Sequence, residues 1–408
     1  MQAKFGSTIH ARNAIVNFVR PTCPINTIHN PAKLSDKIVD YQRVTGNRVM
    51  SYRIIAFDGG GIRGLVSALL LRNLESRANL LDRTDMFAGT SAGSILALGL
   101  AQDTSVEQIV TLFKTKGAAI FDTAMPDKNG AGAAADGEGV NSAYQPDNLK
   151  AELVKLFGPG QLCELPLSGA QVMVNALHLS PASGGQWAPV AIGSGRSDPF
   201  RAMSLVDAAM GSAATPTYFP PHMPEYPANK DWGHFADGGL FANNPSASAI
   251  AYAAQHFQVE LAEVKVLSIG TGMARSDAMP QGTGGPDRMG AWQWFNPVSQ
   301  QGDAISAAPL IDAALSASAA ACGHYAEQMI GGRFLRADAA IGAAYELDDW
   351  QNIDVLEEAA ARVLATAQWD ELADKVAEYW DAPDDLAIPA KAALSRSNRP
   401  WFSTLFRA

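Results

Sequence analysis

The chain has 408 residues, of which 47% are hydrophobic and 18% are charged, a balance typical of a globular protein with a large core. This length suffices for one large α/β domain or two smaller ones. The net charge of −10 argues against a nucleic-acid partner, because nucleic-acid binding needs a clustered basic face.

Residues 1–50 differ in charge from the rest of the chain, with seven Lys and Arg against two Asp. We expect a basic N-terminal extension, and the sequence leaves open whether it lies on the acidic body or docks on anionic lipid. No apolar run reaches the roughly 18 residues needed to span a bilayer, and the N-terminus has no signal-peptide core. The sequence therefore predicts a cytoplasmic or peripheral-membrane protein, while export by another route stays open.

From Ser51 onward, short apolar runs alternate with amphipathic stretches. Strands are predicted at residues 53–57, 172–177 and 264–269. Helices are predicted at residues 64–79, 106–113, 148–156, 204–213 and 246–255. This alternation predicts an α/β fold with a mostly parallel central sheet flanked by helices.

Three glycine-rich stretches interrupt this pattern and are expected to form long surface loops, at residues 128–141, 181–199 and 274–290. From about Pro309 the chain is predicted to be helical. An apolar stripe at helical spacing is expected to be buried there, formed by Trp369, Leu372, Val376, Tyr379 and Trp380. We therefore expect an N-terminal extension (1–50), one domain (51–385) and a C-terminal tail (386–408).

The first predicted strand runs into the sequence DGGGIRG, residues 58–64, and a helix follows. Glycines packed this tightly indicate that something approaches the backbone closely. Backbone N–H groups at a helix N-terminus suit either a phosphate or the oxyanion of a reacting acyl group. The stretch also fits the G-x-G-x-x-G dinucleotide pattern, but the acid expected about 20 residues later, Glu75 or Asp82, does not stand at a strand end.

A second motif, GTSAGS at residues 89–94, fits the G-x-S-x-G nucleophile elbow. In this elbow a serine sits on a sharp turn between a strand and a helix, and small neighbours allow the strained turn to form. The flanking sequences agree, because DMFAG is strand-like and SILALGL is helix-like. The pattern makes Ser91 a candidate nucleophile.

A nucleophilic serine needs a base, and the most distinctive acid is Asp237, in the sequence FADGGLFANNP. Two following glycines predict a tight turn that presents its carboxylate, although turn aspartates are common. None of the seven histidines stands in a loop with small neighbours; they are His10, His29, His178, His222, His234, His256 and His324. A Ser–His–Asp arrangement is therefore not indicated.

Together, DGGGIRG, GTSAG about thirty residues later, and DGG followed by NNP resemble the patatin-like phospholipase family. The block AAMGSAATPTYFPPH before the DGG and VLSIGTG after it are also similar, as is the helical C-terminal half. The resemblance covers roughly residues 52–380. The glycine-rich insertions around 124–143 and 182–198 depart from the family pattern and leave the substrate entrance undefined.

The resemblance implies a three-layer α/β/α acyl hydrolase domain at 51–385, with a Ser–Asp dyad and no catalytic histidine. Ser91 would be the nucleophile and Asp237 its base. The backbone N–H groups of Gly59, Gly60 and Gly61 would form the oxyanion hole, with Arg63 adding positive charge. Five further glycines would support the motifs: Gly64, Gly89, Gly93, Gly238 and Gly239.

The family implies no cofactor and no metal, and the sequence has no EF-hand or HExxH pattern. The three cysteines, Cys23, Cys163 and Cys322, show no metal-ligand spacing and are expected to be free thiols. The implied substrate is a phospholipid, a lysophospholipid or another acyl-ester lipid, presented at a membrane surface. Aromatic and basic residues in the tail suit an interfacial anchor or packing on the domain.

Two alternatives stay open on the same scaffold. The enzyme could transfer the acyl group to an alcohol or thiol instead of water. It could also be an effector phospholipase that degrades membranes when a signal activates it. The choice of head group, the bond cleaved and the oligomeric state are not set by the sequence.

Overall fold

The computed structural model describes residues 51–121, 142–166, 169–179, 185–228, 231–272, 294, 309–342 and 345–381. All of them belong to one unit, Gly46–Ala408. The predicted N-terminal extension, the C-terminal tail and the expected loops at 128–141 and 274–290 lie outside the described residues. The predicted boundaries of the domain therefore stay predictions.

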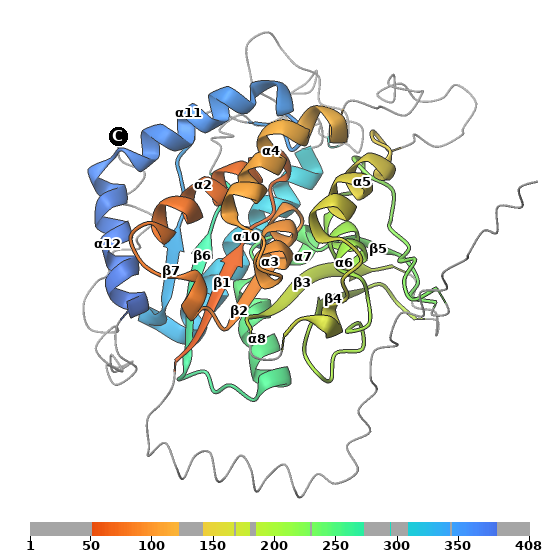
Figure 1. Ribbon diagram of the computed structural model, residues 1–408, viewed down its shortest axis with the longest axis horizontal. Helices are drawn as coiled ribbons and strands as arrows, with labels where there is room; N and C mark the ends of the chain where they lie inside the picture. The colour runs from red at the N-terminus through yellow and green to blue at the C-terminus, as the bar shows by residue number, and fades with distance from the viewer. Residues whose placement is uncertain are drawn as a thin grey trace, which may run out of the picture. The chain divides into compact units, whose positions relative to one another are not determined.

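A seven-stranded sheet forms the centre of the fold, in the order β4-β3-β2-β1-β6-β7, with β5 also paired to β3 (Figure 1). The strands are β1 (Tyr52–Phe57), β2 (Met86–Thr90), β3 (Gln171–His178), β4 (Ala188–Gly193), β5 (Phe235–Asp237), β6 (Val264–Ile269) and β7 (Phe334–Ala337). The pairs β1–β2, β1–β6, β2–β3 and β6–β7 are parallel, whereas β4 and β5 run antiparallel to β3. The prediction of a mostly parallel sheet is confirmed.

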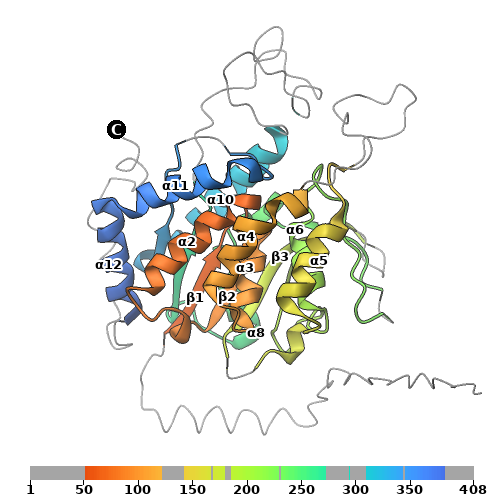
Figure 2. The same ribbon diagram turned by 45° about the horizontal axis from the view of Figure 1, so that its top comes forward.

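Helices cover both faces of this sheet, which gives three layers (Figures 1 and 2). One face carries α2 (Gly64–Glu75), α3 (Ala92–Ala101), α4 (Val106–Phe121), α5 (Pro146–Phe157), α6 (Leu205–Ala213), α11 (Ile353–Leu364) and α12 (Ala367–Asp381). The other face carries α8 (Ser246–Phe257) and the end of α10 (Pro309–Ile330), and the short α7 (Gly239–Ala242) packs on α10. The predicted α/β/α architecture is confirmed.

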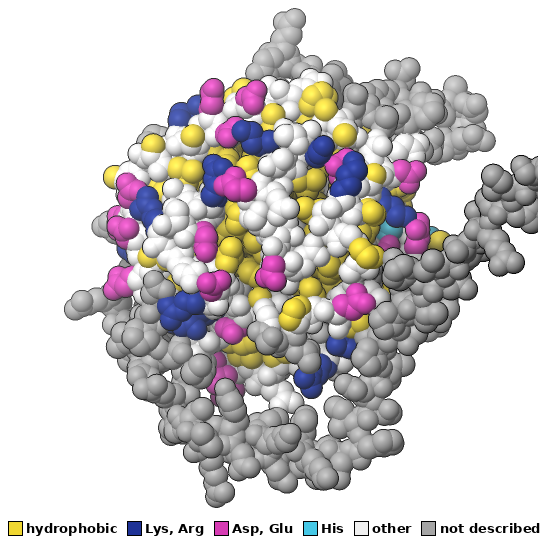
Figure 3. All heavy atoms as spheres, viewed as in Figure 1, with side chains coloured by type: hydrophobic (Ala, Val, Ile, Leu, Met, Phe, Trp, Pro, Cys, Tyr) yellow, Lys and Arg dark blue, Asp and Glu magenta, His cyan; other side chains and the backbone are white. Residues whose placement is uncertain are grey.

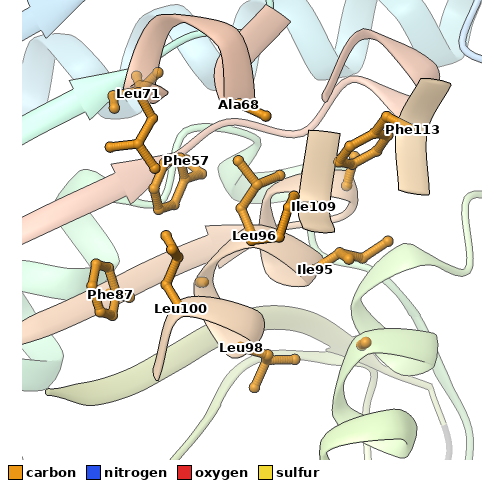
Figure 4. Packing of buried hydrophobic residues seen from close by; sticks show 14 of the residues in the cluster. Phe57, Ala68, Leu71, Phe87, Ile95, Leu96, Leu98, Leu100, Ile109 and Phe113 are labelled. Carbon is orange, nitrogen blue, oxygen red and sulfur yellow. The ribbon is translucent and has the colours of Figure 1, made fainter. Parts of the chain in front are cut away.

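The alternation of side chains along β1 divides the core into two parts. Ile55 and Phe57 point into the larger cluster under α2 and α3, while Ile54 and Ala56 point into a second cluster under α8. Because successive side chains of a strand point to opposite faces, a strand that is apolar on both faces is buried on both. Figure 4 shows Phe57 beside residues of α3, the helix that begins directly after Ser91.

Two strands form where the sequence suggested other structure. Strand β4 lies inside the stretch 181–199, which was expected to be a loop, and β7 lies in the C-terminal part, which was expected to be helical. Both are edge strands: β4 adds to β3, the strand just before it in the chain, and β7 adds to β6, which lies much earlier in the chain. Local composition therefore underestimated them.

The predicted stripe near the C-terminus packs on the core. Trp369, Val376 and Trp380 are buried, while Leu372 and Tyr379 are partly buried. The indole N–H of Trp380 donates to the carbonyl of Leu80 at 3.1 Å, and its own carbonyl accepts from Arg53 at 3.3 Å. Helix α12 thus connects the end of the described chain to β1.

One expectation about the cysteines is wrong. Cys163 is disulfide-bonded. Cys322 is a free, buried thiol, as expected. No helix within the described ranges is both long and apolar enough to cross a bilayer.

On the face shown in Figure 3, Lys and Arg are interspersed with Asp and Glu, and hydrophobic atoms lie between them. Neither sign of charge dominates this view. Such a mixed face offers no continuous basic surface of the kind that nucleic acid requires.

We predict that Trp380→Ala lowers the free energy of unfolding by about 3–5 kcal/mol, because removing a fully buried indole leaves a cavity and breaks its hydrogen bond to the Leu80 carbonyl. Denaturant unfolding followed by circular dichroism measures the change. Trp187→Ala is the matched control, since Trp187 is 71% exposed, and it should change stability by less than about 0.5 kcal/mol. Equal effects of the two substitutions would contradict the assigned packing.

Candidate active site

Strand β3 brings the two predicted catalytic residues together. Thr90, the last residue of β2, pairs with Asn175, and the next residue of β3, Ala176, pairs with Asp237 of β5. Since β4 occupies the opposite edge of β3, β2 and β5 lie end to end along the same edge. Ser91 and Asp237 are therefore neighbours, although 146 positions separate them in the sequence.

Ser91 occupies the turn between β2 and α3 with φ 54° and ψ −125°, a conformation that non-glycine residues rarely adopt. Such strain costs about 1–3 kcal/mol and persists only where the surroundings impose it. Here the Ser91 N–H donates to the hydroxyl of Ser212 at 3.0 Å, and the Ser91 carbonyl accepts from the N–H of Ser94 at 2.8 Å. The predicted nucleophile elbow is present as a conformation.

Asp237 ends β5 and is 1% exposed. One carboxylate oxygen accepts from the hydroxyl of Thr215 at 2.6 Å, and the other accepts from the N–H of Gly239 at 2.7 Å. Burial raises the pKa of Asp237, and the hydrogen bonds from Thr215, Gly239 and the Ser91 hydroxyl partly offset this rise. The Ser91 hydroxyl is thus one of the polar groups that stabilise the charged form of this carboxylate.

No histidine is among the hydrogen-bond partners that the described residues provide to Ser91 and Asp237. His222, which flanks the segment leading to Asp237, contacts Asp207 instead, at 2.9 Å. His178 contacts the carbonyl of Trp232 at 2.7 Å. Among the described residues, the Ser91 hydroxyl therefore acts on a buried carboxylate, and no histidine contacts either group.

The glycine loop lies against Ser91. A Cβ built on Gly59 would lie 3.0 Å from the Cβ of Ser91. The Gly59 N–H donates to the carbonyl of Asn243 at 3.0 Å, so it is already occupied. Within the described part of the chain, the N–H groups of Gly60 and Gly61 donate to no protein acceptor, nor does that of Ala92, directly after Ser91. Of the three predicted donors, two are free to bind a ligand.

Arg63 acts on the loop itself. Its Nε donates to the carbonyl of Gly60 at 3.3 Å. Burial lowers its pKa, while the nearby carboxylates of Asp312, Asp338 and Glu346 act in the opposite direction. The Arg63 side chain is therefore hydrogen-bonded to the backbone of the glycine loop.

All eight predicted motif glycines occupy positions where a side chain would collide. A Cβ would lie within 2.5 Å of a neighbouring atom at each of Gly59, Gly60, Gly61, Gly64, Gly89, Gly93, Gly238 and Gly239. At Gly93 this atom is the carbonyl oxygen of Phe57. Only a glycine lets the start of α3 approach the backbone of β1 this closely. Gly61 also has φ +57°, and its Cβ would meet the carbonyl oxygen of Leu347.

Sequence reasoning missed the ion pair that anchors the glycine loop. Asp58, directly before the glycines, is 3% exposed. It accepts hydrogen bonds from both terminal guanidinium nitrogens of Arg336, at 2.9 and 2.6 Å. Arg336 also donates to Asp338 at 2.6 Å and to the Ser268 hydroxyl at 2.7 Å. Burial raises the pKa of Asp58 to about 6, although Arg336 opposes this shift. The available signal was an acidic residue directly before the glycines of the motif. Its partner, Arg336, lies 278 positions further along the chain.

An apolar cavity of about 60 Å³ opens at Ser91. Its walls come from α3, α4, α5 and the segment after α6, and are almost entirely hydrophobic: Ile62, Ala92, Ile95, Leu112, Phe113, Ile120, Phe121, Leu149, Ala213, Tyr218, Phe219 and Leu347. Gly61, Gly117 and Thr215 complete the lining. Such a lining suits a hydrocarbon chain and disfavours a phosphate.

A family model described as "Patatin-like phospholipase" matches residues 55–250, which contain Ser91, Asp237 and the glycine loop. Residues 55–250 form a patatin-like phospholipase domain. The match ends within α8, so Arg336 and the C-terminal helices lie beyond it.

Three relatives extend this comparison. The chain is 29% identical over 295 residues to the "cGAMP-activated phospholipase" of Pseudomonas aeruginosa, covering 71% of this chain and 79% of that protein. It is 30% identical over 222 residues to "Protein teg" of Priestia megaterium, covering 54% and 63%. It is 27% identical over 257 residues to "Patatin-like protein 1" of Oryza sativa subsp. indica, covering 55% and 60%. The chain thus spans less than two thirds of the last two proteins.

No three His, Cys, Asp or Glu side chains come together as metal ligands within the ranges that the structure describes. The domain itself brings three kinds of group to this place. These are a serine, a buried carboxylate and backbone donors around an apolar cavity.

We predict that Asp237→Asn stabilises the protein relative to wild type, increasingly as pH rises from about 4, the pKa of an unfolded Asp. The raised folded-state pKa means that the wild type loses stability above that pH, because a desolvated charge must form. Asn has no charge at any pH, and all other groups titrate equally in both proteins. Thermal unfolding from pH 4 to 8 measures the difference, and a difference that does not change with pH would contradict the burial argument.

Proposed function

We propose that the protein is a lipid acyl hydrolase that cleaves carboxylic esters of phospholipids or related lipids through an acyl-Ser91 intermediate. The observation that carries this proposal is the strained Ser91, which lies beside the buried Asp237 at the mouth of an apolar cavity. The match to the patatin-like phospholipase family and the names of the relatives support the same reaction class.

In the proposed first step, the Ser91 hydroxyl attacks the ester carbonyl and Asp237 takes its proton. The alcohol leaves with that proton, and the acyl group remains on Ser91. Water then attacks the acyl-enzyme and Asp237 takes its proton. Asp237 returns this proton to the Ser91 oxygen as the acid is released. A raised pKa suits Asp237 to this role, since a base works best when its pKa approaches the working pH.

The oxyanion of each step is assigned to the free N–H groups of Gly60 and Gly61, with Ala92 as a further donor. One such preorganised donor is typically worth about 3 kcal/mol of transition-state stabilisation. Gly59 and Arg63 hold the loop in place through Asn243 and the Gly60 carbonyl. Arg63 can add positive charge from that position, as the sequence suggested.

A nucleotide-binding role fits the site less well. Its glycine loop faces an apolar cavity, and the acid before the glycines is neutralised by Arg336. A phosphate inside the apolar cavity would lose its hydration, and none of the residues that line this cavity carries a charge to replace it. The lipid substrate instead implies contact with a membrane surface, which agrees with a peripheral location.

Signal-activated hydrolysis is the second candidate, because three relatives carry the name "cGAMP-activated phospholipase". Mixed phospholipid vesicles with and without cGAMP would test it, with released fatty acids and lysolipids read by mass spectrometry. The same products show which ester bond is cleaved. An acyl ester formed on an added alcohol would indicate transferase activity instead. Hydrolysis independent of cGAMP would exclude this activator.

We predict that Ser91→Ala lowers kcat on a soluble acyl ester by at least about 1000-fold, because the nucleophile is lost. Ser94→Ala is the matched control, since the Ser94 hydroxyl only donates to the Ser91 carbonyl at 2.5 Å. A fluorophosphonate should label Ser91 alone, as read by peptide mass spectrometry. Labelling at Ser94, or normal turnover by Ser91→Ala, would overturn the assignment.

A further prediction concerns the base. Asp237→Asn should approach the damage of Ser91→Ala, and the double variant should be little worse than either, because the two residues act as one unit. His222→Gln should retain kcat within about tenfold, since His222 contacts Asp207 rather than the dyad. Additive losses, or a loss of about 1000-fold at any histidine in a folded protein, would contradict a Ser–Asp dyad.

A further inference from the structure

A second cavity, of about 240 Å³, adjoins the Ser91 cavity. It is lined by three carboxylates and three aromatic rings, and we call it the acidic pocket: Glu346, Asp348, Asp349, Phe121, Tyr144 and Trp350, with Gln351. Phe121 lines both cavities, and Trp350 packs against Gly117, which lines the Ser91 cavity. The two spaces are thus separated by a single layer of side chains.

Tyr218 lies in this layer. It lines the Ser91 cavity, is 6% exposed, and its hydroxyl has no hydrogen-bond partner. Its ring stacks on Tyr144 of the acidic pocket at 6.5 Å, and the charges that act on its hydroxyl most strongly are Asp348 and Glu346. A buried hydroxyl without a partner is costly, so its retention beside a reacting serine points to a ligand oxygen as its partner.

The carboxylates of the acidic pocket indicate which charged group that ligand carries. Asp348 accepts from the Tyr144 hydroxyl and Asp349 accepts from the Asn352 amide at 2.8 Å, yet neither forms an ion pair with any described residue. Carboxylates next to aromatic faces are the surroundings in which proteins hold quaternary and primary ammonium groups. Arg63 supplies a positive charge that interacts with Glu346 and the Tyr218 hydroxyl.

We propose that the acidic pocket is the head-group site of the Ser91 cavity and takes the ammonium of a zwitterionic phospholipid, while the Tyr218 hydroxyl donates to an oxygen of the same lipid. The ester would lie at Ser91, and the first carbons of the acyl chain would enter the apolar cavity. The phosphate would lie near Arg63. This inference rests on the proposed hydrolase function, and it deepens that function by naming the head-group class.

Binding without turnover tests the head-group site directly. In the Ser91→Ala protein, calorimetric titration compares hexadecylphosphocholine with hexadecylphosphoglycerol, which share the chain and the phosphate and differ in the ammonium. We expect at least about tenfold tighter binding of the phosphocholine, and Asp349→Asn should narrow this preference to about threefold. Asp354→Asn, an exposed acid on α11, should leave the preference unchanged. Absence of a preference, or equal narrowing by Asp354→Asn, would overturn the proposal.

Tyr218→Phe separates a ligand contact from a structural hydroxyl. Removing a hydroxyl that has no partner in the free protein should not lower the melting temperature, while phosphocholine binding should weaken about fivefold. A lower melting temperature with unchanged affinity would instead assign the hydroxyl to the fold, and would overturn its role toward the lipid.

Vesicles of phosphatidylcholine and of phosphatidylglycerol with identical acyl chains complete the test in the wild-type protein. Faster hydrolysis of phosphatidylcholine supports both the hydrolase and its head-group site. Equal hydrolysis of the two lipids overturns the head-group site and leaves the hydrolase intact. No hydrolysis of either lipid, together with preferential phosphocholine binding, overturns the hydrolase function and leaves the ammonium site standing.

Discussion

The arrangement of the site depends on one strand, β3, which pairs along the same edge first with β2 and then with β5. Its register fixes where each of those strands stops: β2 stops at Thr90 and β5 at Asp237. A shift of one residue would turn every side chain of a strand to the opposite face, so the core on both faces of the sheet holds this register. Packing energy spread over the whole sheet therefore sets the distance between a serine and an aspartate.

The same core bears the energetic cost of the site. Ser91 is held at a positive φ, and Asp237 is a carboxylate almost without contact with water. Each feature destabilises the folded state, the first through backbone strain and the second through burial, which raises the pKa of Asp237. In the proposed mechanism, the strain presents the nucleophilic hydroxyl and the raised pKa suits the base. Helix α3, whose ten residues are all buried, supplies the surrounding packing that keeps both in place.

The glycine loop is held from a distant part of the chain. Arg336 of β7 binds Asp58 with both guanidinium nitrogens, and Leu347 accepts the N–H of Ile62 at 2.8 Å. Both partners lie beyond residues 55–250, the range that matches the patatin-like family. The C-terminal part therefore holds the glycine loop in place and also supplies Asp348 and Asp349 to the acidic pocket. In this way the residues proposed to orient the ester and the head group line two cavities that share Phe121.

The sequence by itself determined the alternation of strands and helices, and it marked Ser91, Asp237 and the motif glycines, because tight turns and close backbone contacts restrict which residues can occupy them. It did not reveal β4 or β7, since an edge strand of mixed composition forms only when a neighbouring strand offers hydrogen bonds. Only the tertiary structure decided that Gly59 is already bonded, that Arg336 neutralises Asp58, and that the unpartnered Tyr218 lies between two cavities. These are contacts between segments far apart in the chain, and local sequence pattern carries no information about which distant residues will meet.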